Sequence, residues 1–120
     1  MTNKKLLASI FLSTLLSFNA FAAGSSDSGS SKTKTQYDMA VSHINAAKKF
    51  EENKKLKKAK KRYEKAQKLL IKSNEKFPNK ADTLNYLGFT TRKLGDYENG
   101  EKYYLQGLEI EPNHVGINEY

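Results

Sequence analysis

The sequence predicts an all-α protein, built as a short stack of antiparallel helix pairs. First, residues 63–68 (YEKAQK) are echoed by residues 97–102 (YENGEK), 34 positions later. The segments 77–79 and 111–113 repeat at the same offset. A fixed period of this size indicates stacked helical units. Second, apolar residues recur every three or four positions between breaks at proline or glycine, which is the spacing of one helix face.

Residues 1–22 are expected to form a secretory signal peptide. Lys4 and Lys5 provide the charged start, residues 6–16 are mostly apolar, and residues 20–22 form an Ala-x-Ala cleavage site. We expect cleavage after Ala22 and a periplasmic or secreted mature protein. An uncleaved membrane anchor is the alternative, although the apolar stretch is short for a span of roughly 20 residues. Residues 23–35 are rich in Gly and Ser and predict a flexible linker.

The next 45 residues predict two helices. The first is expected from about Gln36 to Glu52, followed by a break at residues 53–55. The second is expected from about Leu56 to Lys76, because Pro78 disfavours the helical state in the residue before it. The inward faces predicted from the spacing are Tyr37, Ala40, Val41, Ile44 and Ala47 for the first helix, and Leu56, Ala59, Tyr63, Ala66, Leu70, Ser73 and Phe77 for the second.

Two more helices and the start of a fifth are expected after residue 80. The third should run from Ala81 to Leu94, with Gly95 supplying a left-handed turn and Asp96 capping the next helix. The fourth should run from 97 to 110 and stop at Pro112, and residues 115–120 should begin a fifth. The predicted inward residues are Leu84, Leu87, Thr91 and Leu94, followed by Tyr97, Gly100, Tyr104, Gly107 and Leu108.

Residues 81–114 resemble a tetratricopeptide repeat. That motif has a large residue at position 4, Leu-Gly at 7 and 8, small residues at 20 and 27, an aromatic at 24 and Pro at 32. The matching residues are Leu84, Leu87, Gly88, Gly100, Tyr104, Gly107 and Pro112. Thr91 departs from the aromatic expected at position 11. Residues 36–80 match only in their second half, and we interpret them as a divergent basic repeat.

The resemblance implies a right-handed superhelical stack, a TPR-like α-solenoid, whose first helices line a concave groove for a peptide or helix of a partner. The groove positions of the family fall on Asp82, Asn85, Phe89 and Arg92. These four are the predicted partner-binding residues. The resemblance thus implies a non-enzymatic scaffold or adaptor that binds another protein.

Charge is unevenly distributed along the chain, which has a net charge of +8. Residues 48–80 carry 14 Lys/Arg against four acidic residues, whereas residues 81–120 carry three against seven. The lysine-rich stretch is either a solvated helix face or a surface for anionic lipid or polymer of the cell envelope. It comprises Lys54, Lys55, Lys57, Lys58, Lys60, Lys61 and Arg62. Export argues against nucleic acid as the partner.

The sequence shows no pattern typical of a catalytic or metal site. His43 lacks a carboxylate or second histidine at helical spacing, and His114 lies in a predicted interhelix turn, so structural or solvent-exposed roles are favoured. There is no cysteine. No phosphate loop or nucleophile elbow is found. We therefore expect a non-enzyme without cofactor or metal.

Two repeats and a partial third are fewer than the three that such arrays usually need. Leu105, Leu108 and Ile110 are expected to stay partly uncovered. This predicts marginal stability, self-association or completion by another chain, and pairing of the basic half with the acidic half is one concrete form. A fragment of a longer array is the alternative. The sequence names neither partner nor pathway.

Overall fold

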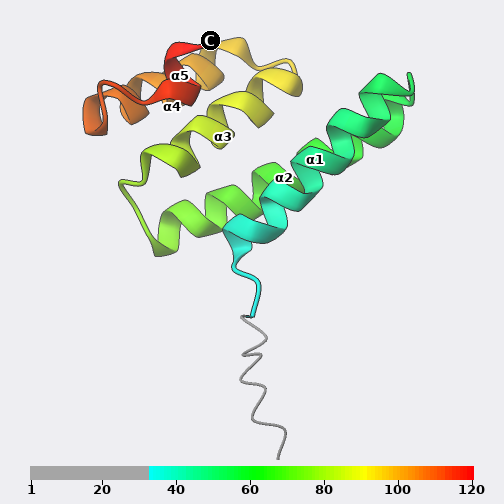
Figure 1. Ribbon diagram of the computed structural model, residues 1–120, viewed down its shortest axis with the longest axis horizontal. Helices are drawn as coiled ribbons and strands as arrows, with labels where there is room; N and C mark the ends of the chain where they lie inside the picture. The colour runs from blue at the N-terminus through cyan, green and yellow to red at the C-terminus, as the bar shows by residue number, and fades with distance from the viewer. Residues whose placement is uncertain (1–32) are drawn as a thin grey trace, which may run out of the picture. The chain divides into compact units, whose positions relative to one another are not determined.

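The computed structural model describes residues 33–120, which form an all-helical unit of two packed helix pairs and a short fifth helix (Figure 1). The helices are α1 (Gln36–Glu52), α2 (Leu56–Lys76), α3 (Ala81–Lys93), α4 (Tyr97–Ile110) and α5 (Val115–Asn118). In Figure 1, α1 lies antiparallel against α2, and α3 against α4. The expected signal peptide and most of the linker lie outside the described residues.

Local sequence signals set the helix ends where the spacing predicted them. Thr35 and Asp38 form a capping box at the start of α1, in which Asp38 N–H donates to Thr35 Oγ1 at 3.1 Å. Gly95, with φ of 94°, ends the third helix in the left-handed conformation that glycine adopts without strain. Asp96 then caps α4 by accepting from Asn99 N–H at 3.1 Å.

The core runs between consecutive helices and is built largely from the predicted inward faces. Ala40, Ile44 and Ala47 of α1 are fully buried. They belong to one hydrophobic cluster with Ala59, Tyr63, Ala66 and Leu70 of α2, Leu84, Leu87 and Phe89 of α3, Tyr104 of α4 and Ile117 of α5. The small alanines allow close approach within the first pair. The prediction of an all-α chain with packed helix pairs is confirmed.

The helices α3 and α4 of the second pair approach each other closely, and this explains the glycines at positions 88 and 100. A Cβ atom on Gly88 would lie 2.5 Å from the Tyr104 ring, and one on Gly100 would lie 3.1 Å from the Gly88 carbonyl oxygen. Real Cβ atoms essentially never come as close as the first distance, so α3 and α4 require a residue without a side chain at position 88. Leu84, Leu87, Gly100, Tyr104 and Gly107 are buried beside it, as predicted.

Three residues predicted to point inward are exposed instead. Leu56, Phe77 and Tyr97 have exposed fractions of 66%, 53% and 66%. Leu56 begins α2 and Phe77 follows its last residue, so both lie beyond the stretch from Ala59 to Ser73 that is buried. Tyr97 begins α4 and lies beside the Arg92 guanidinium, 5.9 Å from ring to cation. Helical periodicity holds along the helices but fails at their ends.

Part of the second pair is left uncovered, as expected. Leu105 and Ile110 on α4 are exposed, Leu108 is half-buried, and Val115 on α5 is exposed. The structure therefore leaves an apolar strip beyond the last packed helices. Across residues 33–120, no helix combines the length and apolar character needed to cross a bilayer.

Candidate interaction site

The four predicted partner-binding residues share one face of α3 but differ in accessibility. Asp82 is exposed, Asn85 and Arg92 are half-buried, and Phe89 is buried with 8% exposed. Phe89 belongs to the core cluster, so its ring forms the floor of the surface rather than a projecting contact. The side chains that reach solvent here are Asp82 at one end and Arg92 at the other.

The short α5 covers the middle of this face. His114 links the two helices, because its Nε2 lies 2.6 Å from Asp82 Oδ1 and its Nδ1 accepts from Ile117 N–H at 3.2 Å. His114 is thus the N-cap of α5, which agrees with the structural role favoured from the sequence. Gly116 lies against Asn85, whose Oδ1 is buried and has no hydrogen-bond partner within residues 33–120. A partner reaches the buried Asn85 Oδ1 only if α5 moves.

Beyond α5, the far end of the face carries a cluster of aromatic rings. Tyr120 stacks on Tyr104 with ring centroids 5.2 Å apart and planes 11° apart. Phe89 lies 5.8 Å from Tyr120 on one side and 5.9 Å from Tyr63 on the other. Burial raises the pKa of Tyr104 to about 12, despite the opposing effect of nearby Arg92. Both stacked rings therefore stay uncharged near neutral pH and can hold a cation against their faces.

Three cations surround these rings. Lys48 Nζ of α1 lies 4.9 Å from the centroid of Phe89, and Lys93 Nζ lies 5.7 Å from it. The Arg92 guanidinium lies 5.7–6.0 Å from the rings of Tyr97, Tyr104 and Tyr120. We refer to Phe89, Tyr104 and Tyr120 with Lys48, Arg92 and Lys93 as the aromatic–cationic cluster. It encloses a shallow cavity of about 280 Å³ lined by Phe89, Arg92, Lys93, Tyr97 and Tyr120.

The cluster is anchored across three helices by one carboxylate. Glu51 of α1 accepts from the Tyr63 hydroxyl at 3.0 Å and from Lys93 Nζ at 3.0 Å. Burial and the Glu51 hydrogen bond raise the pKa of Tyr63 well above its usual range. Since the bonds join α1 to α2 and to α3, they fix the first pair beside the second at this point.

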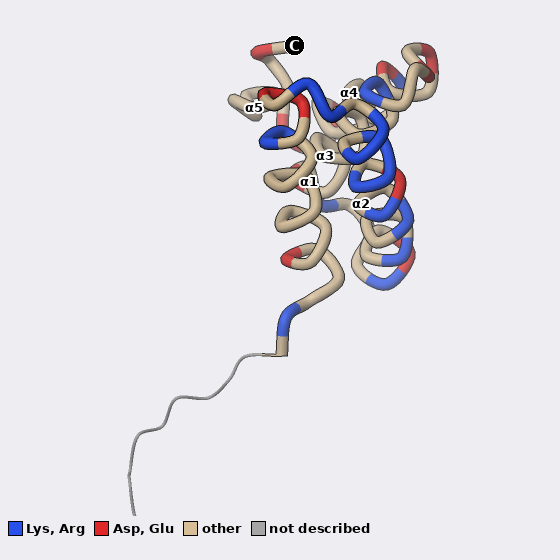
Figure 2. Tube along the Cα trace, turned by 90° about the vertical axis from the view of Figure 1, so that its right-hand side faces the viewer, with Lys and Arg blue, Asp and Glu red and all other residues tan. Residues whose placement is uncertain are grey.

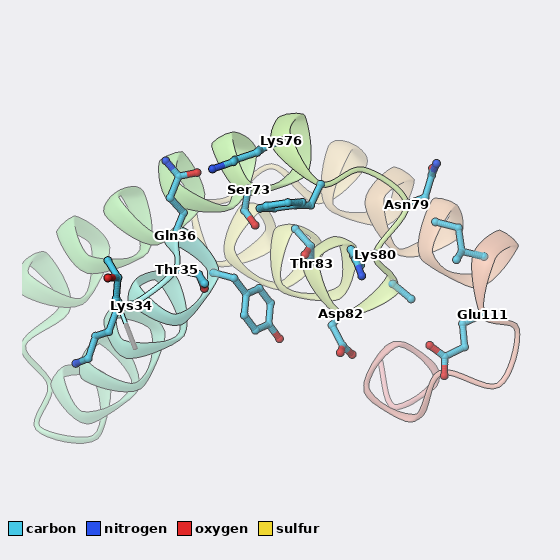
Figure 3. Close-up of a pocket in the computed structure, with 15 residues that line it drawn as sticks. Lys34, Thr35, Gln36, Ser73, Lys76, Asn79, Lys80, Asp82, Thr83 and Glu111 are labelled. Atoms are coloured by element: carbon cyan, nitrogen blue, oxygen red, sulfur yellow. The ribbon is translucent and has the colours of Figure 1, made fainter. Parts of the chain in front are cut away.

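A larger cavity of about 850 Å³ opens at the opposite end of α3, where α1 begins and α2 ends (Figure 3). Tyr37, Phe77, Ala81 and Ile110 give its lining apolar character, and Asp82 lines it as well. Lys34, Lys76 and Lys80 line it too, so charge of both signs is present. Sequence reasoning missed this cavity, because Phe77 and Ile110 lie 33 positions apart and only the packing of the pairs brings them to one opening.

The predicted basic patch forms an exposed surface on α2 and the turn before it (Figure 2). All its lysines are exposed and Arg62 is half-buried. None of the ion pairs found within residues 33–120 includes a residue of this patch. Arg62 Nη1 lies 3.0 Å from His43 Nδ1, and burial together with Arg62 and Lys65 lowers the pKa of His43. No carboxylate of residues 33–120 therefore offsets the charge of this patch through an ion pair.

The part of the chain that the structure describes contains no group of three or more His, Cys, Asp or Glu that could hold a metal ion. No protein-family model, curated protein or solved structure significantly matches the chain. The function is therefore argued from the geometry described above.

Of the residues on this face, the family resemblance had placed Asp82, Asn85, Phe89 and Arg92 at partner-binding positions. It did not identify Lys48, Tyr63 or Tyr120, which come from other helices and from the end of the described chain. Arg92 and Lys93 form a basic pair in the sequence just before the Gly95 turn. This pair is the one local sequence feature that indicates the position of the cluster.

Proposed function

We propose that the chain is an exported, non-enzymatic scaffold with TPR-like helix pairs, which binds another protein through the α3 face. The observation that carries the proposal is the aromatic–cationic cluster. Within it, a shallow cavity is lined by Phe89, Arg92, Lys93, Tyr97 and Tyr120, and Lys48 lies over the Phe89 ring. This is the end of the face where the family resemblance places partner-binding positions. Aromatic residues and arginine are the residue types enriched at protein interfaces.

Several packing features support the TPR-like arrangement. The pair α3–α4 has glycine at the two closest approaches and Tyr104 against Gly88, which is the pattern that the resemblance implies. Thr91, which departs from the motif, is buried and accepts from Gln67 of α2 at 3.0 Å. A polar contact between pairs thus replaces the aromatic packing expected there.

The test is site-specific photo-crosslinking in the native envelope. Tyr97→p-benzoyl-phenylalanine places the crosslinker at the rim of the cluster cavity. Gln106→p-benzoyl-phenylalanine places it on the opposite face of α4, since nine residues correspond to two and a half turns. We expect a discrete crosslinked product from position 97, lost on Arg92→Ala, and none from 106. Equal products from both positions would contradict the proposal.

A second candidate function is attachment to an anionic envelope surface through the basic patch. The observation that favours it is the absence of ion pairs to these residues within the described helices. Binding of this kind is electrostatic and is screened at high ionic strength. The protein should co-sediment with phosphatidylglycerol vesicles at low salt, not with phosphatidylcholine vesicles, and high salt should release it. Binding that resists salt would reject this candidate.

A further inference from the structure

The aromatic–cationic cluster carries more positive charge than its own carboxylates balance. Glu51 is engaged by Lys93 and by the Tyr63 hydroxyl. Lys48 and Arg92 form no ion pair with any carboxylate within residues 33–120. Arg92 therefore lines the cavity, and Lys48 lies over the adjoining Phe89 ring, each without a carboxylate partner. An anionic group brought from outside would find partners that the chain itself does not supply.

The chain already places an aromatic side chain in this site. The Tyr120 ring lies flat on Tyr104, tilted against Phe89 and 5.7 Å from the Arg92 guanidinium. The residue before it is Glu119, so the segment seated on the cluster carries an aromatic ring next to a carboxylate. This segment of the chain therefore indicates the kind of side chain that the cluster accepts, an aromatic ring next to a carboxylate.

Apart from these ring contacts, little holds Tyr120. The residue is 58% exposed, and its only hydrogen bond found in the described chain is from its backbone N–H to the Ile117 carbonyl oxygen. The helix that precedes it, α5, has four residues. A second ring can therefore replace Tyr120 without disturbing Ile117, the residue of α5 that is buried in the core.

We propose that the cluster binds a partner segment in which an aromatic side chain is flanked by carboxylates, and that this side chain displaces Tyr120. The ring of the partner occupies the place of Tyr120 on Tyr104 and Arg92, and its carboxylates pair with Lys48 and Arg92. This inference rests on the proposed function of the α3 face and names the chemistry of its partner. Tyr120 then acts as an internal competitor for the site.

The test measures binding of a fluorescently labelled peptide, one tyrosine between glutamates in a Ser/Gly background, to the full chain by fluorescence polarisation. Tyr120→Ala should tighten binding several-fold, because it removes the competitor. Lys48→Gln combined with Arg92→Gln should weaken it about tenfold, through lost cation–π and ionic contacts. The matched control Lys68→Gln combined with Lys72→Gln removes the same two charges from exposed positions on α2 and should leave binding unchanged.

Two control peptides separate the contribution of the ring from that of the carboxylates. One has leucine in place of tyrosine, the other has glutamine in place of glutamate, and both should bind more weakly. Equal binding of the leucine peptide, or weaker binding by Tyr120→Ala, would overturn the inference. If Arg92→Gln alters the circular dichroism spectrum, Lys48→Gln alone decides, because Lys48 is exposed on α1. If no peptide binds while position 97 still crosslinks to a partner, this inference fails and the proposed function stands. If both are negative, both fail.

Discussion

The close approach of α3 and α4 at Gly88 gives a quantitative prediction for Gly88→Ala. The added Cβ would lie 2.5 Å from Cδ1 and Cε1 and 2.9 Å from Cγ of Tyr104. Because these are three atoms of one planar ring, a rotation cannot move them all away. The ring is also held by stacking on Tyr120 and is 7% exposed. The clash must therefore be relieved by a shift of the ring or of α4.

The expected change in the free energy of unfolding combines two destabilising contributions with one stabilising contribution. Overpacking of this kind costs about 1–3 kcal/mol, and we take the middle of this range, about 2 kcal/mol. Disturbing the Tyr104–Tyr120 stack costs about 0.5–1.5 kcal/mol more. Replacing glycine by alanine inside a helix returns about 1 kcal/mol. We therefore expect Gly88→Ala to lower the free energy of unfolding by about 2 kcal/mol.

Urea unfolding followed by far-UV circular dichroism measures this loss. With a slope of about 1 kcal/mol per molar urea, the midpoint should fall by roughly 2 M. Tyr104→Leu removes the ring, so Gly88→Ala should cost much less in that background, giving a non-additive double-mutant cycle. A midpoint equal to or above the wild type, or two strictly additive effects, would refute the reasoning.

Three further predictions concern pH, capping and salt. Burial raises the pKa values of Tyr37 and Tyr104 to about 12, so the fold favours the neutral phenols. Their contribution to stability should be complete below pH 10 and decline as the pH rises from 10 to 12, measured by urea unfolding at each pH. His114→Ala should lower the free energy of unfolding by about 1 kcal/mol through loss of the α5 cap and the Asp82 bond, and no change in the urea midpoint would contradict that role. If the basic and acidic halves pair between copies, the sedimentation mass should fall from low to high salt, and an unchanged mass would exclude such pairing.

Several helix ends were predictable because they have a local chemical cause. Thr35, Gly95 and Asp96 act within a few residues of themselves, so their effects can be read from neighbouring positions. Burial at the ends was less predictable, as Leu56 and Tyr97 show. Whether a terminal residue is covered depends on how far the neighbouring helix extends, and no local pattern records that.

The candidate site was predictable only on its own helix. Spacing along α3 places Asp82, Asn85, Phe89 and Arg92 on one face, but it does not show that α5 covers the middle of it. Lys48 reaches Phe89 from a helix about 40 positions earlier, and this contact depends on how one pair stacks on the next. The cluster is therefore a product of packing between pairs, which helical periodicity does not encode.

The order in which the helices pack also bears on how the chain folds. The long helices pack mainly in sequence-adjacent pairs, α1 with α2 and α3 with α4, and the connections between helices have three or four residues. Folds dominated by such local contacts close short loops and reach the native state in microseconds to milliseconds. We expect the two hairpins to form early and independently. The Glu51–Lys93 bond should appear last, because it requires both hairpins to be in place, whereas the Glu51–Tyr63 bond lies within the first hairpin.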